Sequence, residues 1–180
     1  MIKVQANYSQ KDIERDLKDW YDKAWKITLV EFRKIALEAV TEARNKEAND
    51  SYREAINSLA NARGVARAII GPETPGFNDQ TANLRASIGF IIMYDGKQVE
   101  QDFQGGGGST VGKTFAGKIA KDYPKGWAII IVAGMEYSSW VEALGYDVIT
   151  GSTLGVNLKV DQALKNVEKA MKSYKSLKRK

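Results

Sequence analysis

The stretch Ser87-Ile-Gly-Phe-Ile-Ile-Met-Tyr-Asp-Gly96 decides the fold class of this chain. Its apolar and β-branched residues are typical of a strand, and Asp95-Gly96 is a strong signal for a two-residue hairpin turn. Lys97 to Phe103 can then return as the partner strand. The most apolar run, Trp127-Ala-Ile-Ile-Ile-Val-Ala133, is short and β-branched, and we expect it to be the central strand. These segments predict a small, mainly antiparallel sheet.

A long helical pattern precedes the sheet. From Ser9 to about Ala48 the chain has no proline or glycine, and its apolar residues recur at helical spacing. Ser9 followed three residues later by Asp12 resembles a capping box, so the helix is expected to begin there. Such a helix is longer than a small domain is wide. It therefore either breaks, near Thr28 or near Asn45, or projects and packs on a neighbouring subunit.

Other segments complete an α+β chain. A second helical stretch is expected from Asp50 or Ser51 to Gly64 or Gly71, and a short helix from Thr114 to Tyr123. A C-terminal helix with an apolar stripe is expected from about Val160 onward.

We interpret residues 1–180 as a single α+β domain with a long N-terminal helix or helix pair, a small sheet and a C-terminal helix. The expected parts are a helical half (1–70), a sheet half (71–157) with a flexible Gly-rich loop (104–113), and a C-terminal helix with a basic tail (158–180).

Composition excludes several classes of chemistry. The 180 residues include no cysteine and no histidine, which removes disulfides, thiolate metal sites and the commonest general base. Nothing approaches the roughly 18 apolar residues of a membrane span, and the N-terminus lacks the apolar stretch of a signal peptide. We therefore expect a cytoplasmic protein that is not an enzyme, needs no metal or cofactor and does not act at a membrane.

One local motif resembles a phosphate-binding site. Gly107-Gly-Ser-Thr-Val-Gly112-Lys113-Thr114 satisfies the pattern of a P-loop, in which backbone N–H groups wrap phosphates, the lysine neutralises them and the threonine hydroxyl holds Mg²⁺. A P-loop follows a buried parallel strand, whereas Val99 to Phe103 carries three polar residues in a row. The chain after Thr114 contains one convincing strand, too few for a nucleotide-binding sheet. We interpret the segment as a loop that orders on assembly.

Two stretches in the middle of the chain carry a shared pattern. Its positions are Thr81, Asn83, Leu84, Arg85, Ser87, Ile88, Tyr137, Trp140, Val141 and Glu142. These positions resemble the head-to-tail joining, or tail-completion, proteins of long-tailed phages and their prophages, in which a T-G-N-L-R-x-S-I stretch opens the sheet and a Y-x-x-[YW]-V-E stretch follows a hydrophobic strand. Ala82 departs from the pattern, since the family usually has glycine there, and so does the segment Tyr146-Asp-Val-Ile-Thr-Gly, which replaces a stretch containing Pro-Phe.

The resemblance implies a non-enzymatic virion protein that assembles into a ring at the neck, between portal and tail tube. It implies homo-oligomers, contacts with other neck or tail proteins, and passive contact with DNA in the ring lumen. The protein would be in the host cytoplasm during assembly and then in the virion.

Two alternatives remain open. A nucleotide-binding enzyme would use Lys113 and Thr114. A nucleic-acid-binding module would use the C-terminal tail, where Lys172, Lys175, Lys178, Arg179 and Lys180 contribute much of the +5 net charge.

Overall fold

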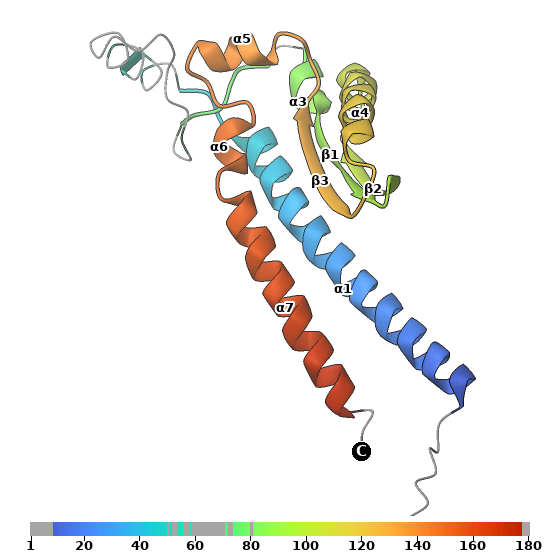
Figure 1. Ribbon diagram of the computed structural model, residues 1–180. Coiled ribbons are helices and arrows are strands. Elements are labelled where there is room, and N and C mark those ends of the chain that lie inside the picture. Colours follow the sequence, from blue (N-terminus) through green and yellow to red (C-terminus); the bar gives the residue numbers. More distant parts are fainter. Residues whose placement is uncertain are drawn as a thin grey trace, which may run out of the picture.

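The computed structural model describes residues 9–49, 51, 54–55, 58, 71, 74–79 and 81–177. The chain is α+β, as predicted (Figure 1). Most of the second predicted helix and the end of the basic tail lie outside the described residues. The elements run, in chain order, as α1 (Gln10–Asn45), α3 (Asn83–Ser87), β1 (Ile88–Tyr94), β2 (Lys97–Phe103), α4 (Gly107–Ile119), the 3-10 helix η1 (Ala120–Asp122), β3 (Trp127–Ala133), α5 (Ser138–Ala143), α6 (Thr150–Thr153) and α7 (Val156–Leu177).

Helix α1 is one continuous helix of 36 residues, about 54 Å long at 1.5 Å per residue. The capping box is confirmed, because the Ser9 side chain accepts from the Asp12 backbone N–H while the Asp12 carboxylate accepts from the Ser9 backbone N–H. The Ser9 hydroxyl also donates to the Asp12 carboxylate at 2.7 Å, and this hydrogen bond, followed by the one from the Ser9 backbone N–H, lowers the pKa of the Asp12 carboxyl. The helix ends at Asn45, one of the two predicted break points, and continues through Thr28.

The sheet has the strand order β2-β1-β3, and both pairs are antiparallel. Asp95 and Gly96 have φ values of 46° and 73°, so the predicted hairpin turn is present with both residues in the left-handed region. The prediction that Trp127 to Ala133 forms the central strand is wrong. Central strand β1 pairs on both sides, whereas among the described strands β3 pairs only with β1. Strand β3 is apolar because helices pack on both of its faces.

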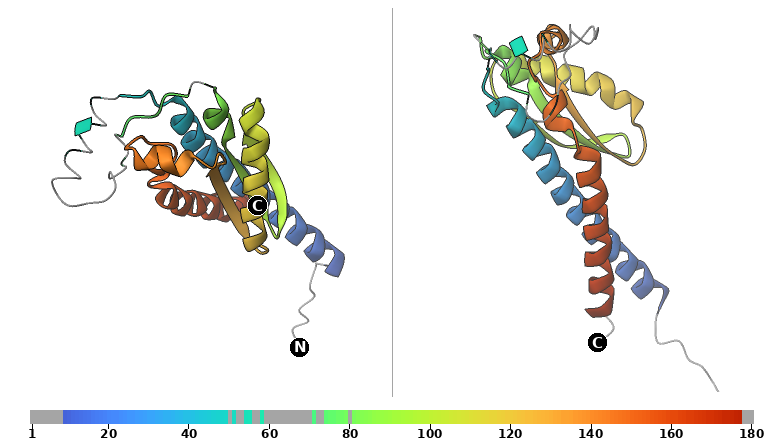
Figure 2. Two further views of the ribbon diagram at one scale, coloured as in Figure 1. Left: turned by 90° about the horizontal axis from the view of Figure 1, so that it is seen from above. Right: turned by 90° about the vertical axis from the view of Figure 1, so that its left-hand side faces the viewer.

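Helices cover both faces of the sheet (Figures 1 and 2). On one face α1 contributes Phe32, Ala36 and Val40 to a core shared with Phe90 and Ile92 of β1. On the other face α4 packs against Ile91, Met93, Ile130 and Val132 through Ala116. This alternation along β1 and β3 follows from the two-residue period of a strand. Helix α7 lies on α1 and buries Ala163, Val167 and Met171, which are spaced four residues apart.

The loop predicted for residues 104–113 is helical from Gly107 onward, and only residues 104–106 lie outside a helix. Helix α4 begins at Gly107 and continues to Ile119. A methyl group on Gly108 would overlap the backbone oxygen of Asn83, and one on Gly112 would overlap that of Ser87. The glycines therefore allow the α4 backbone to approach α3 closely, and this packing outweighs their poor helix propensity. The predicted helix at Thr114 is present but begins seven residues earlier.

An aromatic cluster fixes the middle of α1 to the hairpin end of the sheet. Trp127 contacts Trp25, Phe32 and Tyr94, with ring centroids 5.7, 5.6 and 4.6 Å away. The Tyr21 and Tyr94 hydroxyls hydrogen-bond to each other. That hydrogen bond is the main cause that raises the pKa of Tyr94 to about 12.

We expect Tyr21→Phe to lower the pKa of Tyr94 from about 12 towards its ordinary value near 10. Because the folded-state pKa is the higher one, the Tyr21 hydrogen bond stabilises the fold below pH about 10 and loses that effect as the pH rises towards 12. NMR titration of ¹³C-labelled tyrosine measures this pKa directly. An unchanged Tyr94 titration in Tyr21→Phe would contradict the assignment.

Candidate assembly surface and the ties that hold it

Arg85 ties three segments together. Its guanidinium donates to the backbone oxygens of Arg44, of Lys46 (3.1 Å) and of Phe77 (2.6 Å), and it stacks on the Phe77 ring at 4.8 Å from the centroid. The carbonyls at a helix C-terminus lack partners within the helix, and Arg85 supplies donors to that end of α1. The backbone N–H of Arg85 donates to Asp79 (2.7 Å). Arg85 therefore holds α3, the end of α1 and residues 74–79 in one arrangement.

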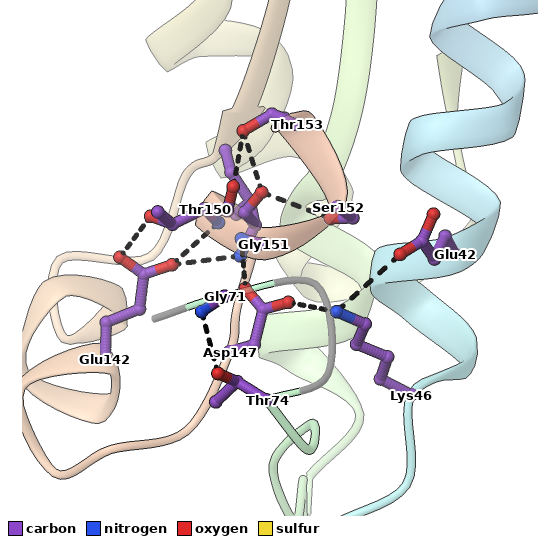
Figure 3. A network of polar contacts seen from close by, with 11 residues as sticks. Glu42, Lys46, Gly71, Thr74, Glu142, Asp147, Thr150, Gly151, Ser152 and Thr153 are labelled. Atoms are coloured by element: carbon purple, nitrogen blue, oxygen red, sulfur yellow. Dashed lines mark hydrogen bonds and ion pairs between the residues drawn. The ribbon is translucent and has the colours of Figure 1, made fainter. Parts of the chain in front are cut away.

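Asp147 makes a second, buried tie (Figure 3). Its carboxylate is fully buried, accepts from the Gly151 backbone N–H at 2.8 Å and pairs with the Lys46 ammonium. Lys46 also pairs with Glu42 of α1 at 3.6 Å. The backbone N–H of Asp147 donates to Pro75 at 2.8 Å. The ion pair thus joins the end of α1 to α6, at the point where the chain turns into α7.

Glu142 caps α6 from the end of α5. One carboxylate oxygen accepts from the backbone N–H groups of Ile149 and Thr150, both at 3.0 Å, and the other accepts from the Thr150 hydroxyl at 2.9 Å. Figure 3 shows this carboxylate reaching the first turn of α6. A carboxylate at a helix N-terminus satisfies free N–H groups and interacts favourably with the helix dipole. Glu142 is therefore a structural cap in this fold.

The motif positions before β1 are structural as well. Leu84 is buried in the core on the α1 side of the sheet. Thr81 is exposed, and its hydroxyl accepts from the Asn83 backbone N–H at 3.4 Å. Ala82 precedes α3 with φ 56°, in the left-handed region that favours glycine. These residues shape the entry into α3, which carries Arg85.

Tyr137 and Trp140, the aromatic motif positions, are exposed. Tyr137 is 40 % exposed and Trp140 on α5 is 63 % exposed. Helices α4 and α5 also enclose an open cavity of about 630 Å³ over the end of β3, and neither Tyr137 nor Trp140 lines it. It is lined by Thr110, Val111, Thr114, Phe115, Lys118, Ala133, Gly134, Met135, Glu136, Ser138 and Ser139.

A smaller cavity of about 220 Å³ shares Phe115, Ala133, Ser138 and Ser139 with the first. We call the two together the α4–α5 groove. Sequence reasoning missed the groove because it treated residues 104–113 as a loop. Val111, Phe115 and Lys118 follow helical spacing, which a helical interpretation would have placed on one face.

The four residues of the P-loop pattern lie along α4. Gly112 is buried, Lys113 is exposed, and the Thr114 hydroxyl donates to the Thr110 carbonyl at 2.8 Å. Because the helix already begins at Gly107, residues 107–112 do not form a loop that wraps a phosphate. In the part of the chain that the structure describes, no three acidic residues are grouped to hold a metal ion. No described helix is both long and apolar enough to cross a membrane.

Comparison with protein-family models, curated proteins and solved structures found no match for this chain.

Proposed function

We propose that this chain is a non-enzymatic structural protein of the neck of a tailed phage or prophage, which assembles into a ring at the head-to-tail connection or completes the tail. The main observation behind the proposal is that the residues matching the family pattern fall into two groups, one structural and one exposed. Arg85 and Glu142 make ties within the subunit, while Tyr137 and Trp140 are exposed on its surface. A rigid subunit with an exposed aromatic surface suits protein-protein assembly.

The backbone at Ala82 is compatible with the family pattern. The family pattern has glycine at this position, and the backbone here has φ 56°, a conformation that glycine adopts without steric cost. The family's preference therefore matches the backbone of this chain, although this chain carries alanine.

We expect Ala82→Gly to stabilise the fold by about 1 kcal/mol, because the left-handed strain of a residue with a Cβ is removed. Ala86→Gly is the matched control. Ala86 lies inside α3 and is buried, so glycine there removes packing and helix propensity and is expected to destabilise. Urea unfolding measures both changes. A loss of stability in Ala82→Gly would contradict the account.

The proposal is tested in a phage or prophage that encodes this sequence. Purified particles are expected to contain the chain as a stoichiometric component of the neck, and its deletion is expected to give separate heads and tails. Particles that lack the chain, or a deletion that leaves infectivity unchanged, would overturn the proposal.

Of the basic residues in the C-terminal tail, Lys172 forms an ion pair with Glu168 one helical turn earlier. Residues 178–180 of the tail lie outside the described part of the chain, and the nucleic-acid-binding alternative has no further support.

A further inference from the structure

The first turns of α1 carry an apolar stripe that the fold leaves exposed. Ile13, Leu17 and Trp20 lie four and three residues apart, which places them on one face of the helix. They are 58 %, 64 % and 41 % exposed. We call residues 9–20 with this stripe the α1 tip. No residue of α1 before Thr28 is buried, so the tip projects from the part of the helix that holds the core.

The stripe lies on the face of α1 that meets α7, because Glu38, which pairs with Lys159 of α7 at 2.8 Å, follows Trp20 by 18 residues, or five helical turns. Lys23 lies over the ring of Tyr174 near the end of α7, at 4.3 Å from the centroid. The two helices diverge towards their free ends (Figures 1 and 2). The apolar side chains of the α1 tip therefore stay exposed to solvent.

Helices α4 and α5, which line the groove, lie at the other end of the molecule from the first turns of α1 (Figure 1), so the tip of a copy cannot reach its own groove. The side chains of Val111 and Phe115, which line the groove, are 41 % and 44 % exposed. Met135 and Ala133 also line it. A groove with this lining suits the apolar face of an amphipathic helix whose anchors are spaced as in the tip.

The charges around the two surfaces are complementary. The α1 tip and the following turn, residues 9–22, carry five acidic and three basic side chains. The segment 107–125, which contains α4, carries four lysines and one acid, and Lys118 lines the groove itself. Glu136 is the acidic residue of the larger cavity and can face the basic residues of the tip. Opposite net charges favour the docking of tip on groove over tip on tip.

We infer that the α1 tip of one copy docks in the α4–α5 groove of the next copy. Two different surfaces then form each contact, which makes the interface heterologous, and repetition of such a contact closes into a ring when the rotation between copies permits. The inference deepens the proposed function, because it names the contact by which copies associate with one another.

Two single variants and their mixture test the docking. Leu17→Glu places an unpaired charge on the tip, and Phe115→Glu places one in the groove; each is expected to weaken self-association about 100-fold. Val30→Glu and Tyr123→Glu are the matched controls, since these side chains are 62 % and 47 % exposed and lie outside both surfaces. Circular dichroism confirms that all four variants fold. Analytical ultracentrifugation of the full chain measures their mass.

The mixture distinguishes tip-in-groove docking from other modes of association. Leu17→Glu keeps an intact groove and Phe115→Glu keeps an intact tip, so the two variants together are expected to form one-to-one dimers that grow no further. Assembly that survives either variant would overturn the inference while leaving the proposed neck function intact, and so would a mixture that stays monomeric. A wild-type chain that remains monomeric at about 1 mM, a concentration at which even weak contacts form, would also overturn it.

Discussion

Replacing Asp147 by alanine is expected to destabilise the fold by about 3–5 kcal/mol, because the buried carboxylate that pairs with Lys46 is removed. Asp147 is fully buried and Lys46 is 14 % exposed, so neither solvent nor the more distant Glu42 carboxylate, at 3.6 Å, replaces this contact in full. The Gly151 N–H also loses its acceptor. Urea unfolding monitored by tryptophan fluorescence measures the change.

A double variant that removes both charges measures how much of this loss comes from the charge that Asp147→Ala leaves on Lys46. Lys46→Met combined with Asp147→Leu removes both charges, and it is expected to be at least about 2 kcal/mol more stable than Asp147→Ala. Glu42→Ala removes the outer, 43 % exposed partner of Lys46 and is expected to cost less than about 1 kcal/mol. If Asp147→Ala lost no more stability than Glu42→Ala, the buried pair would not be what holds α6 to α1.

Gly112→Ala is expected to destabilise the fold by about 2 kcal/mol, although alanine is the better helix former. The added methyl group would overlap the Ser87 backbone oxygen and the Phe103 ring, and overpacking of this kind costs up to about 3 kcal/mol. The higher helix propensity of alanine offsets about 1 kcal/mol of this destabilisation. Backbone atoms cannot move aside as a flexible side chain can, so the cost remains.

Gly117→Ala is the control for this substitution, because it lies in the same helix with nothing within 4 Å of the added methyl group. It is expected to stabilise the fold by about 0.5–1 kcal/mol. The two variants should therefore shift the urea midpoint in opposite directions. A shared direction would contradict the assignment of Gly112 to a close backbone contact and would reopen a loop role for the segment.

Local chemistry made several elements predictable from the sequence. Ser9 with Asp12 carries its own capping box, and Asp95-Gly96 adopts the positive φ values that a two-residue hairpin needs. Each signal depends on residues within four positions. Such features are predictable because their stabilisation comes from neighbours along the chain.

The errors came from contacts between distant segments. Gly108 and Gly112 have low helix propensity, and only their approach to α3 explains why the segment is helical. Composition could not assign β3 to an edge, because a strand covered on both faces is apolar whether or not both of its edges are paired.

The candidate site was predictable in its positions but not in its contacts. Arg85 and Glu142 were identified by resemblance, yet the sequence did not reveal that Arg85 reaches Arg44 and Lys46, about forty residues earlier. Lys46 and Asp147 are separated by 101 residues, and no sequence pattern pairs them. The α4–α5 groove exists only when α4 and α5 are placed together over β3.

The central claim is that the chain is an assembly subunit and not a nucleotide-dependent enzyme. Light scattering of the purified protein across a concentration series, with and without ATP and Mg²⁺, tests it most directly. We predict that the mass rises with concentration to a closed oligomer and is the same with and without nucleotide. A monomer whose mass or melting temperature responds to ATP and Mg²⁺, with the response lost in Lys113→Ala, would contradict the account.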